Sequence, residues 1–186
     1  MKSFSAADGL ASYTEVGGVS RHALEEQFTG LLAANASALS RLAASYTDST
    51  TDRDDLLQDI ALALWLALPR FRRECSERTF LYRIAHNRCI THLSKKRPVV
   101  ALDDEQIDPI DPTPRADVRL SQEERGQRLL RAIRRLPVIY RHVIVLTLEG
   151  MGYREIAQVL GIGESNVGVR LNRARQLLKK ILGESP

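Results

Sequence analysis

The segment 166–180, NVGVRLNRARQLLKK, has two chemically different faces when it is drawn as a helix. At helical spacing one stripe is apolar and must face a core; it consists of Val167, Leu171, Ala174, Leu178 and Ile181. The opposite face is polar and basic: Ser165, Asn166, Val169, Asn172, Arg173 and Gln176, with Arg170 and Arg175 at its margins. Asn, Gln and Arg read base edges in the major groove, while flanking Arg and Lys neutralise phosphates. The pattern therefore predicts a helix that binds duplex DNA.

A short glycine-containing turn precedes this helix. Gly161-Ile162-Gly163 joins it to an amphipathic segment at 153–160. A tight turn between two short helices is typical of a helix-turn-helix, in which the second helix enters the groove. An ordinary solvated helical hairpin would show the same turn, and the segment alone leaves that alternative open.

A second basic segment, RFRRECSERTFLYR at 70–83, interleaves arginines with aromatic side chains. Arginines hold a nucleic-acid backbone and aromatic faces stack on unpaired bases, so this composition favours capture of a single strand. Phe80 and Tyr82 could instead belong to the core, the more natural place for Phe80. The run KKR at 95–97 could contact phosphate, although a solvated helix end would look identical.

The segment 52–68, DRDDLLQDIALALWLAL, is apolar on two sides. Its expected core stripe is Leu57, Ile60, Ala61, Leu64 and Leu68. Asp55, Asp59, Leu62 and Leu66 lie opposite. A small module that exposes such a face normally has a protein partner covering it. Acidic residues that favour a helix N-terminus would account for Asp54 and Asp55, but not for Asp59 or Leu62.

One cluster of residue types suggests a metal. His86, Cys89 and His92 recur every three residues, and Cys75 is free nearby in sequence. Steps of three spread the trio over about 120° of a helix at ~100° per residue, and no fourth ligand is evident. We therefore expect no metal and no other cofactor. We find no pairing of a nucleophile with a base and no carboxylate dyad, and we do not expect an enzyme.

The composition is that of a globular chain with a modest basic excess. The 186 residues include 27 Lys and Arg against 23 Asp and Glu, a net charge of +4 that suits a polyanionic partner. Two cysteines provide no disulfide framework and suit a reducing compartment. The N-terminus has no apolar signal segment, and the longest apolar run, 60–68, is too short to span a bilayer. We expect a soluble, cytoplasmic protein without membrane insertion.

Charge and proline divide the chain into four parts. Residues 1–20 are expected to be disordered. Residues 21–97 carry a net charge of +3, residues 98–122 carry −4, and residues 123–186 carry +6. The middle segment holds four of the seven prolines, which remove backbone donors and bar helix, so it reads as an extended acidic linker. Two small helical domains on either side of this linker are predicted.

The sequence predicts an all-α fold. Helices are expected over 22–46, over 52–68 with Asp52 as its cap, over 76–96 with Ser76 as its cap, over 123–136, and from Pro137 to Glu149. The run VIVLTL at 143–148 is rich in β-branched residues, so a strand is the alternative there. Gly150 is expected to end that helix.

Two stretches resemble one protein family. Residues 130–180 resemble the C-terminal, −35-binding domain of bacterial RNA polymerase sigma factors. Residues 52–97 resemble the promoter-melting domain of the extracytoplasmic-function (ECF) class of the sigma-70 family. Both halves stand in the family's order, and the resemblance spans about residues 22–183. It implies an alternative sigma factor that binds core polymerase, recognises −10 and −35 elements and initiates transcription.

The resemblance assigns roles to individual positions. The residues that would meet the clamp helices of the largest polymerase subunit are Asp54, Asp55, Gln58, Asp59, Leu62 and Leu66. Those that would hold the −10 element are Phe71, Arg72, Arg73, Glu74, Ser76, Thr79, Tyr82, Arg83, Asn87, Arg88, Lys95, Lys96 and Arg97. Those that would bind the −35 element are Arg154, Ser165, Asn166, Val169, Arg170, Asn172, Arg173 and Lys180. The flap of the second-largest subunit and an anti-sigma factor are further candidate partners, and the acidic linker would thread toward the polymerase active centre.

Two alternatives from other classes remain at this point. One is a helix-turn-helix regulator that dimerises and acts without polymerase. The other is a metal- or redox-sensing variant built on His86, Cys89 and His92.

Overall fold

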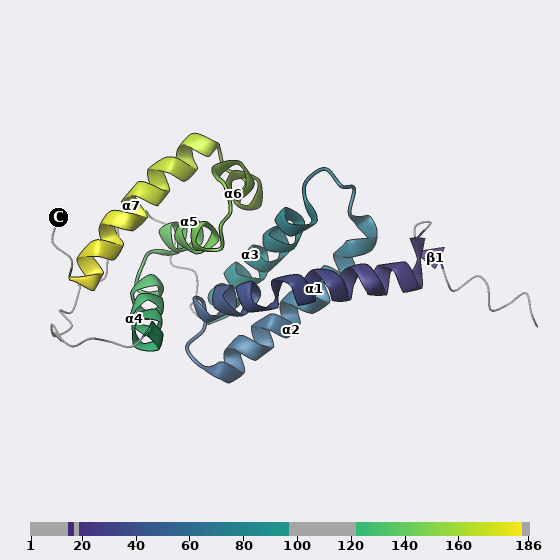
Figure 1. Ribbon diagram of the computed structural model, residues 1–186, viewed down its shortest axis with the longest axis horizontal. Helices are drawn as coiled ribbons and strands as arrows, with labels where there is room; N and C mark the ends of the chain where they lie inside the picture. The colour runs from purple at the N-terminus through teal and green to yellow at the C-terminus, as the bar shows by residue number, and fades with distance from the viewer. Residues whose placement is uncertain (1–14, 17–18, 97–121, 184–186) are drawn as a thin grey trace, which may run out of the picture.

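A computed structural model describes residues 15–16, 19–96 and 122–183 (Figure 1). The N-terminal module contains α1 (Arg21–Ala44), α2 (Thr50–Ala67), the short 3-10 helix η2 (Leu68–Arg70) and α3 (Glu77–Lys96). The C-terminal module contains α4 (Gln122–Arg134), α5 (Val138–Leu148), α6 (Tyr153–Leu160) and α7 (Glu164–Leu182). The predicted all-α fold is confirmed, and the predicted helices lie within a few residues of the observed ones. Of the predicted linker, residues 98–121 lie outside the described part of the chain.

A small ladder precedes the first helix. β1 (Glu15–Val16) pairs antiparallel with β2 (Val19–Ser20), with Val16 opposite Val19. These four residues lie within the extension 1–20 that the sequence predicts to be disordered, and their backbone groups pair with each other. The other residues of the predicted N-terminal extension lie outside the described part.

Helix ends follow local chemistry, with one correction. α2 is capped by Ser49, whose Oγ accepts a hydrogen bond from the Asp52 amide at 3.1 Å, and not by Asp52 as predicted. Ser49 as the cap starts the helix at Thr50, which leaves Asp52 inside the first turn. Ser76 caps α3 as predicted, since its Oγ accepts from the Thr79 amide at 3.0 Å.

α5 resolves the choice between helix and strand at the β-branched run. It is a helix with six buried residues: Tyr140, His142, Val143, Ile144, Val145 and Leu146. A helix covered on nearly all sides can carry β-branched residues, because tertiary packing outweighs their lower helix propensity. Gly150 ends it with a φ of 78°, a left-handed conformation that favours glycine.

The two modules share one core. α1, α2 and α3 pack on one another, α4 to α7 form a second group, and α3 packs against α6 (Figure 1). Buried residues of both modules belong to a single continuous cluster that includes Leu56, Ile60 and Leu81 on one side and Val143, Ile156 and Leu171 on the other. Across the described ranges, no helix is both long enough and apolar enough to cross a membrane.

Candidate functional site

The outward face of α7 has the predicted composition. Val167, Leu171 and Ala174 are fully buried, while Leu178 and Ile181 pack partly against the core. The polar residues opposite are exposed: Ser165, Asn166, Asn172, Arg173 and Gln176. Val169 is 53% exposed among them, and Arg170 is half-buried at the margin. The helix thus presents amide, guanidinium and apolar groups together, the set that distinguishes base pairs in a major groove.

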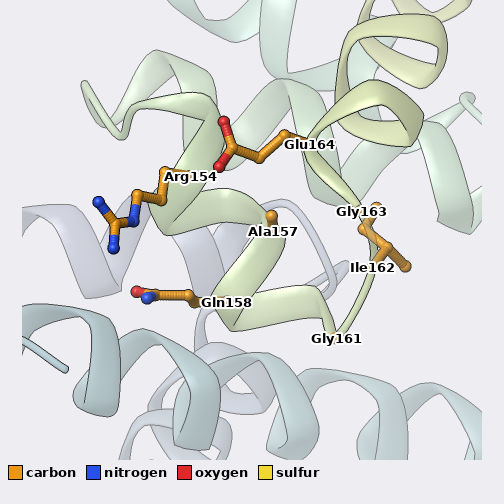
Figure 2. Close-up of a pocket in the computed structure, with 7 residues that line it drawn as sticks. All are labelled: Arg154, Ala157, Gln158, Gly161, Ile162, Gly163 and Glu164. Atoms are coloured by element: carbon orange, nitrogen blue, oxygen red, sulfur yellow. The ribbon is translucent and has the colours of Figure 1, made fainter. Parts of the chain in front are cut away.

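α6 and the turn place this helix. Glu155 Oε2 accepts a hydrogen bond from the Gly152 amide at 2.9 Å, which satisfies a free donor at the start of α6. Gly161 then takes a φ of 67°, and this left-handed residue turns the chain toward α7. A shallow open depression lies along α6 and the turn, with Arg154 and Gln158 pointing from the same side of α6 and Glu164 at the start of α7 (Figure 2).

Two basic residues on α7 have different surroundings. Arg173 Nη1 lies 3.5 Å from the hydroxyl of Tyr140 on α5, so the guanidinium contacts a neighbouring helix of its own module. Lys180 is exposed in the last turn of the helix. A positioned guanidinium suits a directional contact with a base, whereas a free ammonium suits a phosphate.

The loop between η2 and α3 has an unusual backbone. Arg73 has a φ of 57°, the only positive φ outside glycine among the residues that the structure describes. Such a conformation costs of order 1–3 kcal/mol and often marks a functional loop. Arg72, Arg73 and Glu74 are exposed, and the ring of Phe71 packs on Phe80 with centroids 4.5 Å apart. Part of the Phe71 ring is therefore covered by Phe80.

Two predicted −10 residues do not fit that role here. Tyr82 is fully buried beneath the guanidinium of Arg78, whose Cζ lies 5.5 Å from the ring centroid, so the ring has no free face for a base. Burial also raises the pKa of the Tyr82 hydroxyl. Thr79 is 1% exposed, and its Oγ1 lies 2.8 Å from Ser76 Oγ within the cap of α3. Both side chains serve the fold in this structure, and their assignment to the −10 element stays a prediction.

The other predicted −10 residues stay on the surface as far as the structure describes them. Arg83, Asn87, Arg88 and Lys95 are exposed along α3, and the Ser76 side chain is exposed although it caps the helix. Arg83 Nη2 reaches Cys75 Sγ at 3.5 Å. The side chain of Lys96 and all of Arg97 lie outside the described part of the chain.

The outer face of α2 is exposed as predicted. Leu62 and Leu66 are 59% and 65% exposed, and Asp54, Asp55, Gln58 and Asp59 are also exposed. Leu56, Ile60 and Leu64 are fully buried on the inner face, so Leu56 joins the expected stripe and Leu57 lies only partly buried. A face with three carboxylates followed by two leucines along one helix fits a protein surface with basic and apolar groups.

The three side chains of the histidine and cysteine trio have different surroundings. Cys89 is fully buried, and burial raises the pKa of its thiol well above the usual range. His86 packs edge-on against His142, and His92 Nε2 lies 3.1 Å from Asp52 Oδ1. Within the described ranges no three His, Cys, Asp or Glu side chains are grouped to hold a metal ion. Each of the three side chains therefore packs against a different part of the protein.

Sequence reasoning missed the residues that join the two modules. They are Arg41, Tyr46, Arg78, Arg134, Arg141, His142 and Glu149. No local spacing connects them, because each residue lies 71 to 108 positions away in the chain from its partner in the other module, and the Tyr46–His142 ring contact falls in the same range.

Family models match both modules. Residues 31–99 match sigma-70 region 2, and residues 126–178 match sigma-70 region 4. The chain belongs to the sigma-70 family. It is also 34% identical over 148 residues to the ECF RNA polymerase sigma factor SigM of Mycobacterium tuberculosis, a match that covers 78% of this chain and 71% of SigM.

Solved structures agree with this assignment. The sigma factor CnrH, solved in complex with the cytosolic domain of CnrY, matches with a TM-score of 0.65 and 28% identity over 87% of this chain and 91% of that one. RpoE of Bartonella quintana, solved with the anti-sigma factor NepR, shares the fold at a TM-score of 0.65 and 23% identity, covering 87% of this chain and 99% of that one.

The family settles the general function. This chain is an ECF-type RNA polymerase sigma factor that acts in transcription initiation. Sigma factors bind core RNA polymerase and promoter DNA, and they are initiation factors rather than enzymes.

Proposed function

We propose that the three exposed surfaces divide the work of initiation. The outer face of α2, with Asp54, Asp55, Gln58, Asp59, Leu62 and Leu66, binds the clamp helices of the largest polymerase subunit. The observation that supports this is the exposure of Leu62 and Leu66 on a helix whose other side is fully buried. Exposed leucines among carboxylates lose contact with water only when a partner covers them.

The loop before α3 and the exposed side of α3 hold the −10 element in this proposal. The arginines of the loop contact the backbone of the displaced strand, and the left-handed Arg73 fixes the direction of the loop. The residues assigned here are Phe71, Arg72, Arg73, Glu74, Ser76, Arg83, Asn87, Arg88 and Lys95.

α7 enters the major groove of the −35 element. Asn166, Asn172 and Arg173 lie where base edges would be, Val169 can meet a thymine methyl, and Arg154, Arg170 and Lys180 hold phosphates. The C-terminal module also meets the flap of the second-largest polymerase subunit. Because the polymerase of a bacterium transcribes in the cytoplasm, the protein acts there. RpoE was solved with the anti-sigma factor NepR and CnrH with the cytosolic domain of CnrY, so an anti-sigma factor is a candidate partner of this chain too.

Run-off transcription with purified core polymerase tests this function. The full chain should direct transcripts from a promoter that carries its −10 and −35 elements, and core polymerase alone should not. Absence of any sigma-dependent transcript across a library of promoter sequences would contradict the proposal.

A further inference from the structure

Tyr153, the first residue of α6, lies against α7 at a position that has no side chain. The tyrosine itself is 45% exposed. A Cβ added at Gly168 of α7 would lie 3.6 Å from Tyr153 Cε2 and, apart from its own helix turn, would meet nothing else within 4 Å. One edge of the tyrosine ring therefore packs on α7 at Gly168, while the rest of the side chain remains open to a ligand.

Gly168 stands at the border between the two faces of α7. Val167 before it is fully buried, Val169 after it is 53% exposed, and successive residues of a helix are about 100° apart. Gly168 therefore lies on one flank of the polar face, and Arg170 lies half-buried on the other flank. With its ring on this flank, Tyr153 extends the DNA-reading surface from α7 to the start of α6.

The ring keeps this place only while residue 168 is small. Among the described residues, the glycines with a positive φ are Gly150, Gly161 and Gly183, so Gly168 has a backbone that other residues can adopt. A methyl group 3.6 Å from the ring is in ordinary van der Waals contact, and alanine would fit. A longer side chain would have to share the space with the ring of Tyr153. Substitutions at Gly168 therefore test side-chain size without backbone strain.

The dimensions of duplex DNA bring a sugar–phosphate backbone to this flank. An α-helix with its side chains is about 10–12 Å wide and the major groove is about 12 Å wide, so a helix in the groove has its flanks near both backbones. In a helix-turn-helix the first helix crosses a backbone while the second enters the groove. Tyr153 belongs to the first helix and lies on a flank of the second. Both relations place its hydroxyl near phosphate oxygens, for which tyrosine is a suitable donor.

We propose that Tyr153 is a further contact residue for the −35 element: its hydroxyl donates a hydrogen bond to a phosphate on the Gly168 side of α7. Gly168 is a positioning residue that leaves room for the ring. The proposal rests on the function proposed above, because it takes α7 as the helix in the groove. A tyrosine hydroxyl brings no positive charge, so this contact fixes the register of α7 without releasing a counterion from the DNA.

Tyr153→Phe removes only the hydroxyl and tests the contact. The measurement is a salt titration of holoenzyme, assembled from this chain and core polymerase, on promoter fragments with matched and mismatched −35 elements. The variant should bind every fragment about three- to tenfold more weakly, the effect of one hydrogen bond. The salt slope and the preference among −35 sequences should not change. Wild-type affinity would overturn the contact, and a changed slope or preference would overturn its assignment as a neutral phosphate contact.

Neutral phosphate analogues locate the contact on the DNA. A methylphosphonate replaces one phosphate at a time along each strand of the −35 duplex in the same fragments. One replacement should weaken the binding of the wild type more than that of Tyr153→Phe, and the other sensitive phosphates should affect both proteins equally. Identical scans of the two proteins would overturn the contact, even if the variant binds more weakly. Run-off transcription by the wild-type holoenzyme reports on the proposed function separately, since it does not depend on this hydroxyl being a contact.

A size series at Gly168 tests the position of the ring. Gly168→Ala should keep wild-type binding and raise the Tm by a few degrees, because alanine favours a helix. Gly168→Leu should displace the ring and bind as weakly as Tyr153→Phe, and the combined variant Tyr153→Phe/Gly168→Leu should lose no more than either alone. Gly30→Leu, at a glycine of α1 where an added Cβ would meet nothing within 4 Å, is the matched control. Wild-type binding by Gly168→Leu, or additive losses in the combined variant, would overturn the positioning role.

Discussion

Arg73 combines a strained backbone with an exposed cation in the loop before α3. A left-handed φ costs a residue with a Cβ roughly 1 kcal/mol or more, whereas glycine adopts it freely. The residue stays in this conformation because both ends of the loop are fixed, by the turn after η2 and by the Ser76 cap. Backbone and side chain can therefore be tested separately at this position.

Arg73→Gly should leave the protein as stable as the wild type, or slightly more stable, while promoter opening decreases. Arg73→Ala should decrease opening equally but keep the cost of the strained backbone, giving a Tm a few degrees below that of Arg73→Gly. Thermal melting and open-complex formation on duplex promoters measure the two effects. A pre-melted template should recover much of the loss, because the cost of unstacking, a few kcal/mol, is then already met. Equal defects on both templates would contradict a role in opening.

Arg173 and Lys180 should behave differently on −35 DNA. Arg173→Ala should cost about 1–3 kcal/mol on the cognate element and relax preference at one base position, because a positioned guanidinium can make a bidentate contact with guanine. Lys180→Ala should weaken binding to all sequences alike and reduce the salt slope by about one unit. The measurement is a salt titration of the full chain on matched and mismatched −35 duplexes. Identical behaviour of the two variants would mean that α7 only holds the backbone.

At the scale of elements, α2 has two faces with different surroundings. Its inner stripe is buried in the core and its outer face exposes leucines and carboxylates. Substitutions on the outer face should therefore separate binding from folding, since they remove no buried contact.

Asp55→Arg combined with Asp59→Arg should abolish binding to core polymerase while the helical content and the Tm stay near those of the wild type. Reversing two charges places repulsive groups against a surface that is expected to be basic. Pull-down with core polymerase and circular dichroism are the measurements. Glu26→Arg with Glu123→Arg, two exposed glutamates on α1 and α4, is the matched control. Unchanged polymerase binding by the aspartate variant would refute the assignment of this face.

At the scale of the whole molecule, the histidine pair should make the contact between the two modules depend on pH. His142 is faced by Tyr46, His86, Arg141 and Arg170, which offer no carboxylate to stabilise an imidazolium. His86 has a pKa of about 4 in this contact and an ordinary value near 6.5 when exposed. The modules in contact therefore bind fewer protons than separated modules. The contact is at full strength above pH 6.5 and weakens as the pH falls toward 4, by at most about 1.4 kcal/mol per pH unit for each histidine.

Energy transfer between dyes attached at Ala33→Cys and Gln127→Cys, two exposed positions, in a Cys75→Ser background measures the contact between the modules. From pH 7.5 to 5.5 the transfer should decrease with acid. This window lies above the range in which carboxyl groups ordinarily titrate, so the ion pair of Arg41 with Glu149 is not the cause. His86→Gln combined with His142→Gln should remove the dependence, whereas His22→Gln, at an exposed histidine of α1, should retain it. A pH-independent transfer in the chain with both histidines would contradict a role of the pair in this contact.

The sequence alone determined the parts of this protein that depend on local order. The spacing of Val167, Leu171 and Ala174 placed the inner stripe of α7 and so its outer, polar face, because side-chain direction on a helix follows from 3.6 residues per turn. Local patterns also predicted that Leu62 and Leu66 are exposed and that α5 ends at Gly150. The order of two family-like segments was also readable, and the family models confirm it.

Only the tertiary structure decided how the two modules meet. The arginine contacts to Glu149, Ala44 and Ser45 join residues far apart in the chain, and no periodicity encodes such pairs. The same packing buried Tyr82, which composition had suggested for base stacking, and sent His86 to His142 rather than to a metal. Burial and charge pairing depend on which surfaces come together, and that is a property of the folded chain rather than of any segment of it.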